Sequence, residues 1–203
     1  MMKPVIAFRA LLLFPLLSIL AACGGSSPLG NPPAVINTGV TNTQALSFAY
    51  FQRCINPIFN EQLQSSVNAS TNTCAAAGCH ASATGAGGAL RIVPLPTAQL
   101  IDVTNAANTP AVIRASDMYK NFYSAQGEVV IAAPLLSKLL NKPLLRETLH
   151  GGGLIFGSTS DPHVQLITYW INNPAPIGQD EFSTATYNMF SPADPVNGTC
   201  KTQ

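Results

Sequence analysis

Two cysteines and a histidine stand close together in the segment Cys74-Ala75-Ala76-Ala77-Gly78-Cys79-His80. Two thiols can add across the two vinyl groups of a haem, and the imidazole of the next residue can bind the iron. The same side chains can instead form a disulfide or contribute to a Cys2His2 zinc site. Four residues separate the cysteines, whereas the usual haem-attachment motif has two. The motif predicts one covalent haem c, with disulfide and zinc chemistry as alternatives.

Amphipathic helices are expected on both sides of this motif. Apolar residues recur at helical spacing over 45–59, which predicts a helix there. A short apolar helix is expected over 134–140 and a closing helix over 161–171, where Pro162 occupies the first turn. A polar stretch over 60–73 predicts a surface loop. Together these patterns predict a mostly α fold with long loops.

Three segments of the sequence resemble the Planctomycete-type cytochrome c family and its proteobacterial relatives. Phe51-Gln52-Arg53-Cys54-Ile55-Asn56-Pro57-Ile58-Phe59 resembles the approach to the haem motif in that family. Gly85-Ala86-Gly87-Gly88-Ala89-Leu90-Arg91-Ile92 resembles the glycine-rich stretch that follows it, and 161–171 resembles the closing helix. The resemblance covers about Phe48 to Pro176 and implies a cytochrome c-like helical haem domain. The four-residue spacer and the polar stretch over 60–73 depart from the family pattern.

The resemblance also implies the axial ligands of the haem iron. His80 is expected as the proximal ligand. His150-Gly151-Gly152-Gly153 sits where relatives carry a His-Gly-Gly or a Met-Pro pair, so His150 is expected on the distal side. Arg91 is expected either to pair with a haem propionate or to lie in solvent. The competing sixth ligands are His163, Met118 and Met189.

Iron with two imidazole ligands has no open position for a substrate, which favours electron transfer over enzymatic catalysis. The expected function is therefore one-electron transfer between redox partner proteins by a monohaem c-type cytochrome. The alternative is a non-redox extracytoplasmic module, in which Cys74 and Cys79 form a disulfide or join His80 and His150 at a zinc site. A hydrolase is not expected, because no G-x-S-x-G elbow accompanies the His-Gly-Gly-Gly stretch.

The N-terminus carries the features of a lipoprotein signal. Lys3 and Arg9 precede an apolar run that ends in Leu20-Ala21-Ala22-Cys23 and is too short for a stable membrane span. The order Leu-Ala-Ala-Cys resembles the bacterial lipobox, whose cysteine receives lipid chains. The resemblance implies a signal peptide over 1–22, lipidation of Cys23 and membrane attachment through lipid only. No acidic residue follows Cys23 directly, which in related lipoproteins favours the outer membrane, on its periplasmic or surface face.

Composition bounds the rest of the chain. The stretch 23–42 is rich in glycine, proline and asparagine and predicts a flexible tether, and 43–203 fits one domain. Loss of Lys3 and Arg9 with the leader reduces the ten basic side chains to eight, against nine acidic ones. Because a nearly neutral chain offers no basic face to phosphates, nucleic acid is not expected as a partner.

The five cysteines can be divided by role. Once Cys23 is assigned to lipid and Cys74 and Cys79 to haem, Cys54 and Cys200 remain. In an oxidising compartment two remaining thiols are most simply a disulfide. In the chain-entropy account, a disulfide that closes so long a loop raises the free energy of unfolding by about 4 to 5 kcal/mol. The rival pairing joins Cys74 to Cys79 and leaves no haem.

Overall fold

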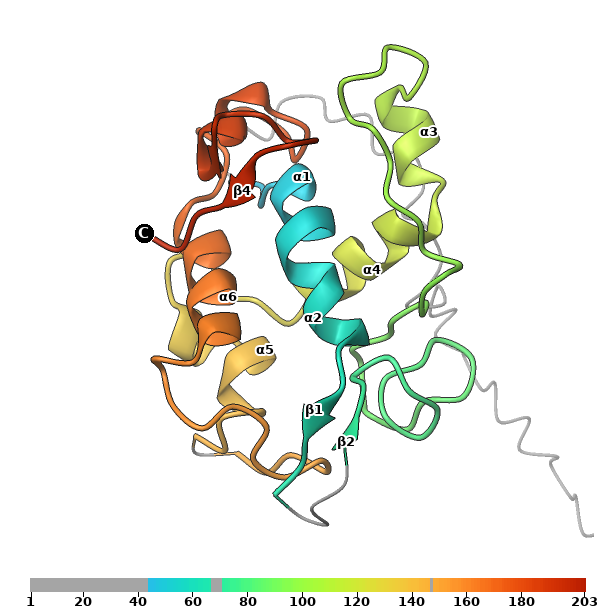
Figure 1. The fold of residues 1–203 in the computed structure, drawn as a ribbon, viewed down its shortest axis with the longest axis vertical. Coiled ribbons are helices and arrows are strands. Elements are labelled where there is room, and N and C mark those ends of the chain that lie inside the picture. Colours follow the sequence, from blue (N-terminus) through green and yellow to red (C-terminus); the bar gives the residue numbers. More distant parts are fainter. Residues whose placement is uncertain (1–43, 67–70, 147) are drawn as a thin grey trace, which may run out of the picture.

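The computed structural model describes residues 44–66, 71–146 and 148–203. The described chain is mostly helical, with short helices joined by long loops and two small pairs of antiparallel strands (Figure 1). The prediction of short helices with long loops and little sheet is therefore confirmed, and the expected cytochrome c-like arrangement stays a prediction. No helix in the described ranges is long and apolar enough to cross a membrane. The expected signal peptide (1–22), the tether (23–42) and Cys23 lie outside the described residues.

The predicted first helix forms as three consecutive segments, α1 (Phe48–Tyr50), the π-helical η1 (Phe51–Ile55) and α2 (Asn56–Asn60). It begins later than expected, because the Ser47 hydroxyl accepts the Tyr50 N–H at 3.2 Å and caps the first turn. At η1 the Asn56 N–H donates to the Phe51 carbonyl, five residues back. Pro57 follows at once and has no N–H to continue the ordinary ladder, which gives a physical reason for the wider turn.

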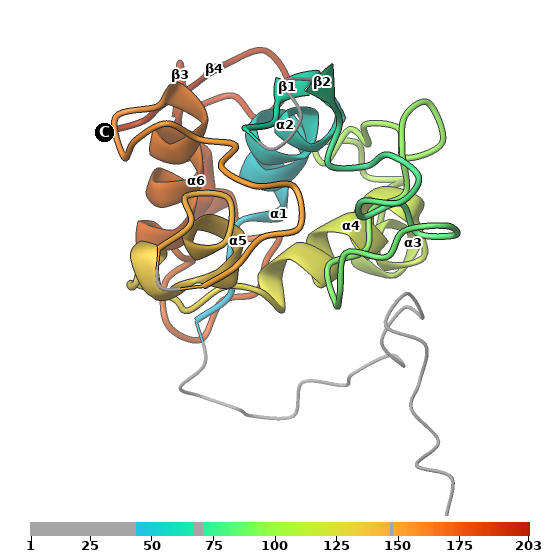
Figure 2. The same cartoon turned by 90° about the horizontal axis from the view of Figure 1, so that it is seen from below.

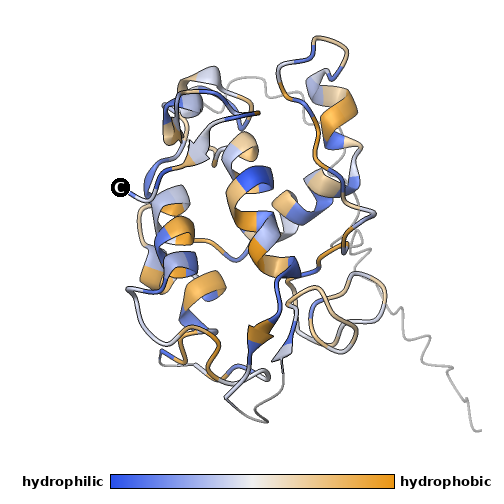
Figure 3. Cartoon of the chain, viewed as in Figure 1, coloured by the Kyte–Doolittle hydropathy of each residue, from blue (hydrophilic) through white to orange (hydrophobic). Residues whose placement is uncertain are grey.

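This first helix lies between α6 (Pro162–Asn172) on one side and α4 (Asp117–Gln126) on the other in both ribbon views (Figures 1 and 2). Aromatic rings fill the contact: the Phe51 ring centre lies 5.4 Å from that of Trp170 and 5.5 Å from that of Phe122. All three side chains are fully buried. These helices carry both apolar and polar residues, as expected for helices that have one face in a core and the other towards solvent (Figure 3).

The closing helix α6 begins as predicted. The Asp161 carboxylate accepts the His163 N–H at 2.8 Å, and Pro162 occupies the first turn. The short helix expected over 134–140 divides at Ser137, where the backbone is extended, into η2 (Pro134–Leu136) and α5 (Lys138–Asn141). The other helical elements are α3 (Pro110–Arg114) and η3 (Thr184–Met189).

The polar stretch over 60–73 contains more structure than a loop. β1 (Leu63–Gln64) pairs with β2 (Thr71–Asn72) in an antiparallel register, with Leu63 opposite Asn72. Most of its described residues are exposed, as the prediction of a surface segment requires. The strand pair adjoins the end of α2 and leads directly into the cysteine motif (Figure 1).

A disulfide joins Cys54 in η1 to Cys200 in β4 (Thr199–Cys200), with a Cα–Cα distance of 6.0 Å. The predicted pairing is confirmed. β4 pairs with β3 (Phe190–Ser191), and the Tyr50 hydroxyl donates to the Lys201 carbonyl beside the disulfide. The C-terminal segment is thus held against the first helix by a covalent bond and by the hydrogen bond from the Tyr50 hydroxyl.

Candidate functional site

The cysteine motif is docked on the end of α2. The Ala75 N–H donates to the Phe59 carbonyl at 2.8 Å, and the His80 N–H donates back to the Cys74 carbonyl at 2.9 Å. Gly78 has φ +81°, a conformation that is easy only for glycine. The four-residue spacer therefore folds into compact turns that bring both cysteines and His80 to one side of α2.

Both cysteine thiols of the motif are free. Burial, and then the neighbouring thiol of Cys79, raise the pKa of the Cys74 thiol to about 11. The Asn72 side-chain amide lies 3.7 Å from the Cys79 sulfur. Both thiols line one cavity together with His80.

His80 presents one ring nitrogen to the cavity. Its Nδ1 lies 3.1 Å from the Leu90 carbonyl oxygen, and the Ile92 N–H donates to the His80 carbonyl at 2.7 Å. Burial lowers the pKa of His80, and the charges of Arg91 and Lys142 act in the same direction. Since a carbonyl can only accept, Nδ1 of the neutral ring carries the proton and Nε2 keeps a lone pair.

His150 is held in the same way. Its Nδ1 lies 2.8 Å from the Gly153 carbonyl oxygen, so its Nε2 is also the nitrogen without a backbone partner. The Gly153 N–H donates to the His150 carbonyl at 2.9 Å, and Gly153 has φ +73°. The glycine thus closes a tight turn that turns the imidazole back over its own loop.

The two imidazoles face a common space. Their ring centres are 6.3 Å apart and their planes differ by 10°. Two imidazoles that bind one metal from opposite sides have ring centres roughly 6 Å apart, because each metal–nitrogen bond is about 2.0–2.1 Å and the ring centre lies about 1.2 Å beyond the nitrogen. The separation of His80 and His150 matches that of a shared axial pair.

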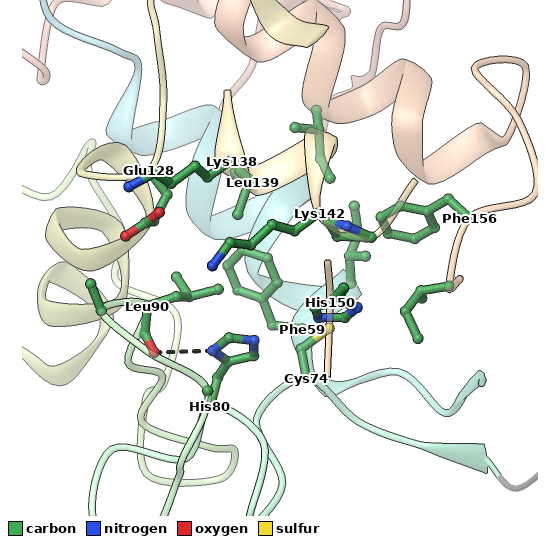
Figure 4. Close-up of a pocket in the computed structure, with 16 residues that line it drawn as sticks. Phe59, Cys74, His80, Leu90, Glu128, Lys138, Leu139, Lys142, His150 and Phe156 are labelled. Carbon is green, nitrogen blue, oxygen red and sulfur yellow. Dashed lines mark hydrogen bonds between the residues drawn. The ribbon is translucent and has the colours of Figure 1, made fainter. Parts of the chain in front are cut away.

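A cavity of about 530 Å³ opens around these residues, with Cys74, Cys79, His80 and His150 in its wall. A second, smaller inner chamber shares Cys74, His80 and His150 with this cavity and is also lined by apolar residues that include Phe59, Leu139, Phe156 and Ile167 (Figure 4). Cofactor pockets in proteins are mostly apolar, hold a few polar groups and have volumes of about 300–1,000 Å³. A flat apolar group of cofactor size fits this description.

No family model, curated protein or solved structure matches this chain.

Two glycines let the chain pass close to the imidazoles. A Cβ at Gly87 would lie 2.6 Å from His80 Cε1 and 2.6 Å from His80 Nδ1. A Cβ at Gly152 would lie 3.1 Å from His150 Cε1, a milder contact. The glycine-rich segment 85–92 therefore packs directly on the His80 ring, where larger residues could not.

The competing sixth ligands lie elsewhere. His163 Nε2 lies 2.9 Å from a Glu61 carboxylate oxygen, and His163 Nδ1 lies 3.1 Å from an Asp161 carboxylate oxygen, so both of its nitrogens are engaged. Met118 and Met189 are buried in the hydrophobic core, and neither lines the cavity or the inner chamber. His150 is the candidate that the fold brings opposite His80.

Two cations stand near the site. Lys142 lines both the cavity and the inner chamber, and in the described ranges its ammonium has no hydrogen-bond or ion-pair partner (Figure 4). Arg91, expected either beside a propionate or in solvent, has a buried Nη1 without a hydrogen-bond partner among the described residues. Lys142 could meet an anionic group of a bound cofactor, whereas Arg91 lines neither the cavity nor the inner chamber. Arg91 was identified from the sequence, whereas Lys142 was missed because an isolated lysine carries no motif.

No cluster of three or more His, Cys, Asp or Glu side chains in the described part of the chain could hold a metal ion. What the fold assembles is instead a pair of imidazoles and a pair of thiols around one cavity.

Proposed function

We propose that this protein is a lipid-anchored monohaem c-type cytochrome of the bacterial envelope that transfers electrons between redox partner proteins. The observation that carries the proposal is the pair of nearly parallel imidazoles of His80 and His150, 6.3 Å between ring centres, beside two free thiols. The same observation favours a cytochrome c-like haem domain over 43–203.

The chain has the groups to attach the cofactor. Each thiol of Cys74 and Cys79 would add its sulfur to one vinyl carbon and its hydrogen to the other, so that two thioethers form and nothing leaves. His80 and His150 would occupy the two axial positions through Nε2. The Leu90 and Gly153 carbonyls accept from the opposite ring nitrogens, which fixes the tautomer and makes each Nε2 a better donor.

A bound haem iron would supply a one-electron couple. Two protein ligands leave no position for a substrate or oxygen, so we propose electron transfer and no enzymatic activity. The apolar lining around Phe59, Leu139 and Phe156 would keep water from the iron. Lys142 would supply positive charge to the propionates.

The residues of the N-terminus support a proposal for the location of the protein. We propose that Cys23 carries the lipid that holds the domain at the membrane, with 23–42 as the tether. The anchored domain would then meet its redox partners at the outer membrane, on the periplasmic or the surface face.

The proposal is tested by producing the full chain with a c-type maturation system. The product should gain the mass of one haem and give a pyridine haemochrome spectrum that survives acid-acetone extraction. The double variant Cys74→Ala/Cys79→Ala should lose both. If the purified protein contains stoichiometric zinc without haem, or a Cys74–Cys79 disulfide, the cytochrome proposal is wrong and the non-redox module is favoured.

A further inference from the structure

The loop that carries His150 depends on a contact with a distant segment. Ser65 and Ser66 follow β1 directly and reach the loop across more than eighty residues of sequence. The Leu154 N–H donates to the Ser66 hydroxyl oxygen at 2.8 Å, and the Ser66 N–H donates to the Leu154 carbonyl at 3.2 Å. The Ser65 hydroxyl donates to the Gly152 carbonyl.

These hydrogen bonds hold the residues on both sides of Gly153, whose carbonyl orients His150. Gly152 and Leu154 are the neighbours of Gly153, and the Gly153 carbonyl is the acceptor for His150 Nδ1. Holding the residues on both sides fixes the direction of that carbonyl. The position of the imidazole is therefore coupled to Ser65 and Ser66.

The loop needs such support because its own sequence gives it little. It contains three consecutive glycines, which lose more conformational freedom on ordering than other residues. Leu149, the residue before His150, is 91 % exposed and contributes no packing to the core. His80, in contrast, lies between the cysteine motif and the glycine-rich segment 85–92.

The strand pair is itself anchored at its base. A Glu61 carboxylate oxygen lies 2.9 Å from His163 Nε2, at the start of α6. The His163 ring also lies near that of Phe156, with 5.9 Å between the ring centres. The segment from Glu61 to Ser66 thus bridges a rigid helix and the His150 loop.

We propose that Ser65 and Ser66 form a clamp that holds His150 opposite His80, with Ser66 as the principal positioning residue. This inference rests on the proposed cytochrome function. The clamp determines how often the distal position opens, and hence how rapidly an external ligand such as carbon monoxide reaches the iron.

The test uses the full chain with its haem attached. Ser65→Ala/Ser66→Ala should bind carbon monoxide in the reduced state about tenfold faster than the wild type, since the distal imidazole must leave first and about two hydrogen bonds no longer oppose it. Ser66→Thr keeps the hydroxyl and should restore the slow rate in the Ser65→Ala background. Ser160→Ala makes the same chemical change at an exposed position and should leave the rate unchanged.

A second readout separates this inference from the proposed function. Hydrogen exchange should show the Leu154 amide protected in the wild type and released in Ser65→Ala/Ser66→Ala, whether or not haem is attached. Absence of covalent haem together with a protected Leu154 amide would end the cytochrome proposal and leave the clamp. Unchanged carbon monoxide binding in the double variant, or a Leu154 amide that exchanges freely in the wild type, would overturn the clamp.

Discussion

Gly87 lies against the ring of His80 so closely that a methyl group would come within 2.6 Å of both Cε1 and Nδ1. Real Cβ atoms do not approach other heavy atoms to this distance. The His80 imidazole is therefore held on one side by the Leu90 carbonyl and on the other by the backbone at Gly87. Any side chain at Gly87 must move either the ring or the loop.

Replacing Gly87 with alanine should therefore reduce haem incorporation at least several-fold, because His80 could no longer keep its orientation. The measurement is the ratio of haem absorbance to protein after maturation. Gly157→Ala is the matched control, since a Cβ there would meet nothing within 4 Å. Equal incorporation in Gly87→Ala and Gly157→Ala would show that the close approach has no bearing on the cofactor.

The distal ligand is tested by His150→Ala. The wild type should be six-coordinate and low-spin, without the charge-transfer band of His/Met iron. The variant should become high-spin and bind carbon monoxide rapidly, as seen in absorption spectra of the oxidised and reduced protein. His163→Ala should remain low-spin, because both of its ring nitrogens are engaged by carboxylates. A high-spin His163→Ala beside a low-spin His150→Ala would assign the distal position to His163.

Lys142 places a positive charge in the wall of the cavity. A positive charge favours the reduced haem, which carries one positive charge fewer, so Lys142→Gln should lower the midpoint potential by tens of millivolts. Potentiometric titration measures this directly. Lys201→Gln, at a lysine outside the cavity, should leave the potential unchanged. A potential that rises in Lys142→Gln would contradict the proposed role of this charge.

The Cys54–Cys200 disulfide should stabilise the fold without affecting the absorption spectrum of the haem. Cys200→Ser should lower the free energy of unfolding by about 2 to 5 kcal/mol, because the unfolded chain regains the freedom of a long loop. Neither Cys54 nor Cys200 lines the cavity or the inner chamber, so the haem bands should not move. Chemical denaturation provides the measurement. The double variant Cys54→Ser/Cys200→Ser should be no less stable than the single one, and an additional loss of similar size would argue against the pairing.

The lipid anchor is tested at Cys23. Cys23→Ser should release the protein from the membrane fraction or leave it unprocessed, since the thiol accepts the diacylglyceryl group. Labelling with radioactive palmitate compares the two proteins directly. Equal labelling of wild type and variant would remove the anchor from the proposal.

Local patterns in the sequence predicted the helices that are determined by neighbouring residues. Apolar spacing identified the first helix, and Asp161 with Pro162 identified the start of α6. The π-helical turn of η1 was not predicted, because Pro57 signals a break without specifying how the backbone accommodates it. The Cys54–Cys200 bond was found by parity and confirmed.

The candidate site was predicted in part. His80 and His150 were both selected from the sequence, and the fold brings their rings to 6.3 Å. The contact of Ser65 and Ser66 with Gly152 and Leu154 was missed. Hydrogen bonds between two loops far apart in the chain leave no periodicity in either, so no pattern within one sequence could reveal them.

The bond between Cys54 and Cys200 has a consequence for the order of assembly. Synthesis proceeds from the N-terminus, so Cys54, Cys74 and Cys79 are all complete while Cys200, 146 residues beyond its partner, is still to come. Among the described residues, the thiols present during that interval with which Cys54 could pair wrongly are those of Cys74 and Cys79. Correct oxidation must therefore wait until Cys200 has been made, and early capture of Cys74 and Cys79 by a cofactor would remove these two wrong partners before the right one arrives.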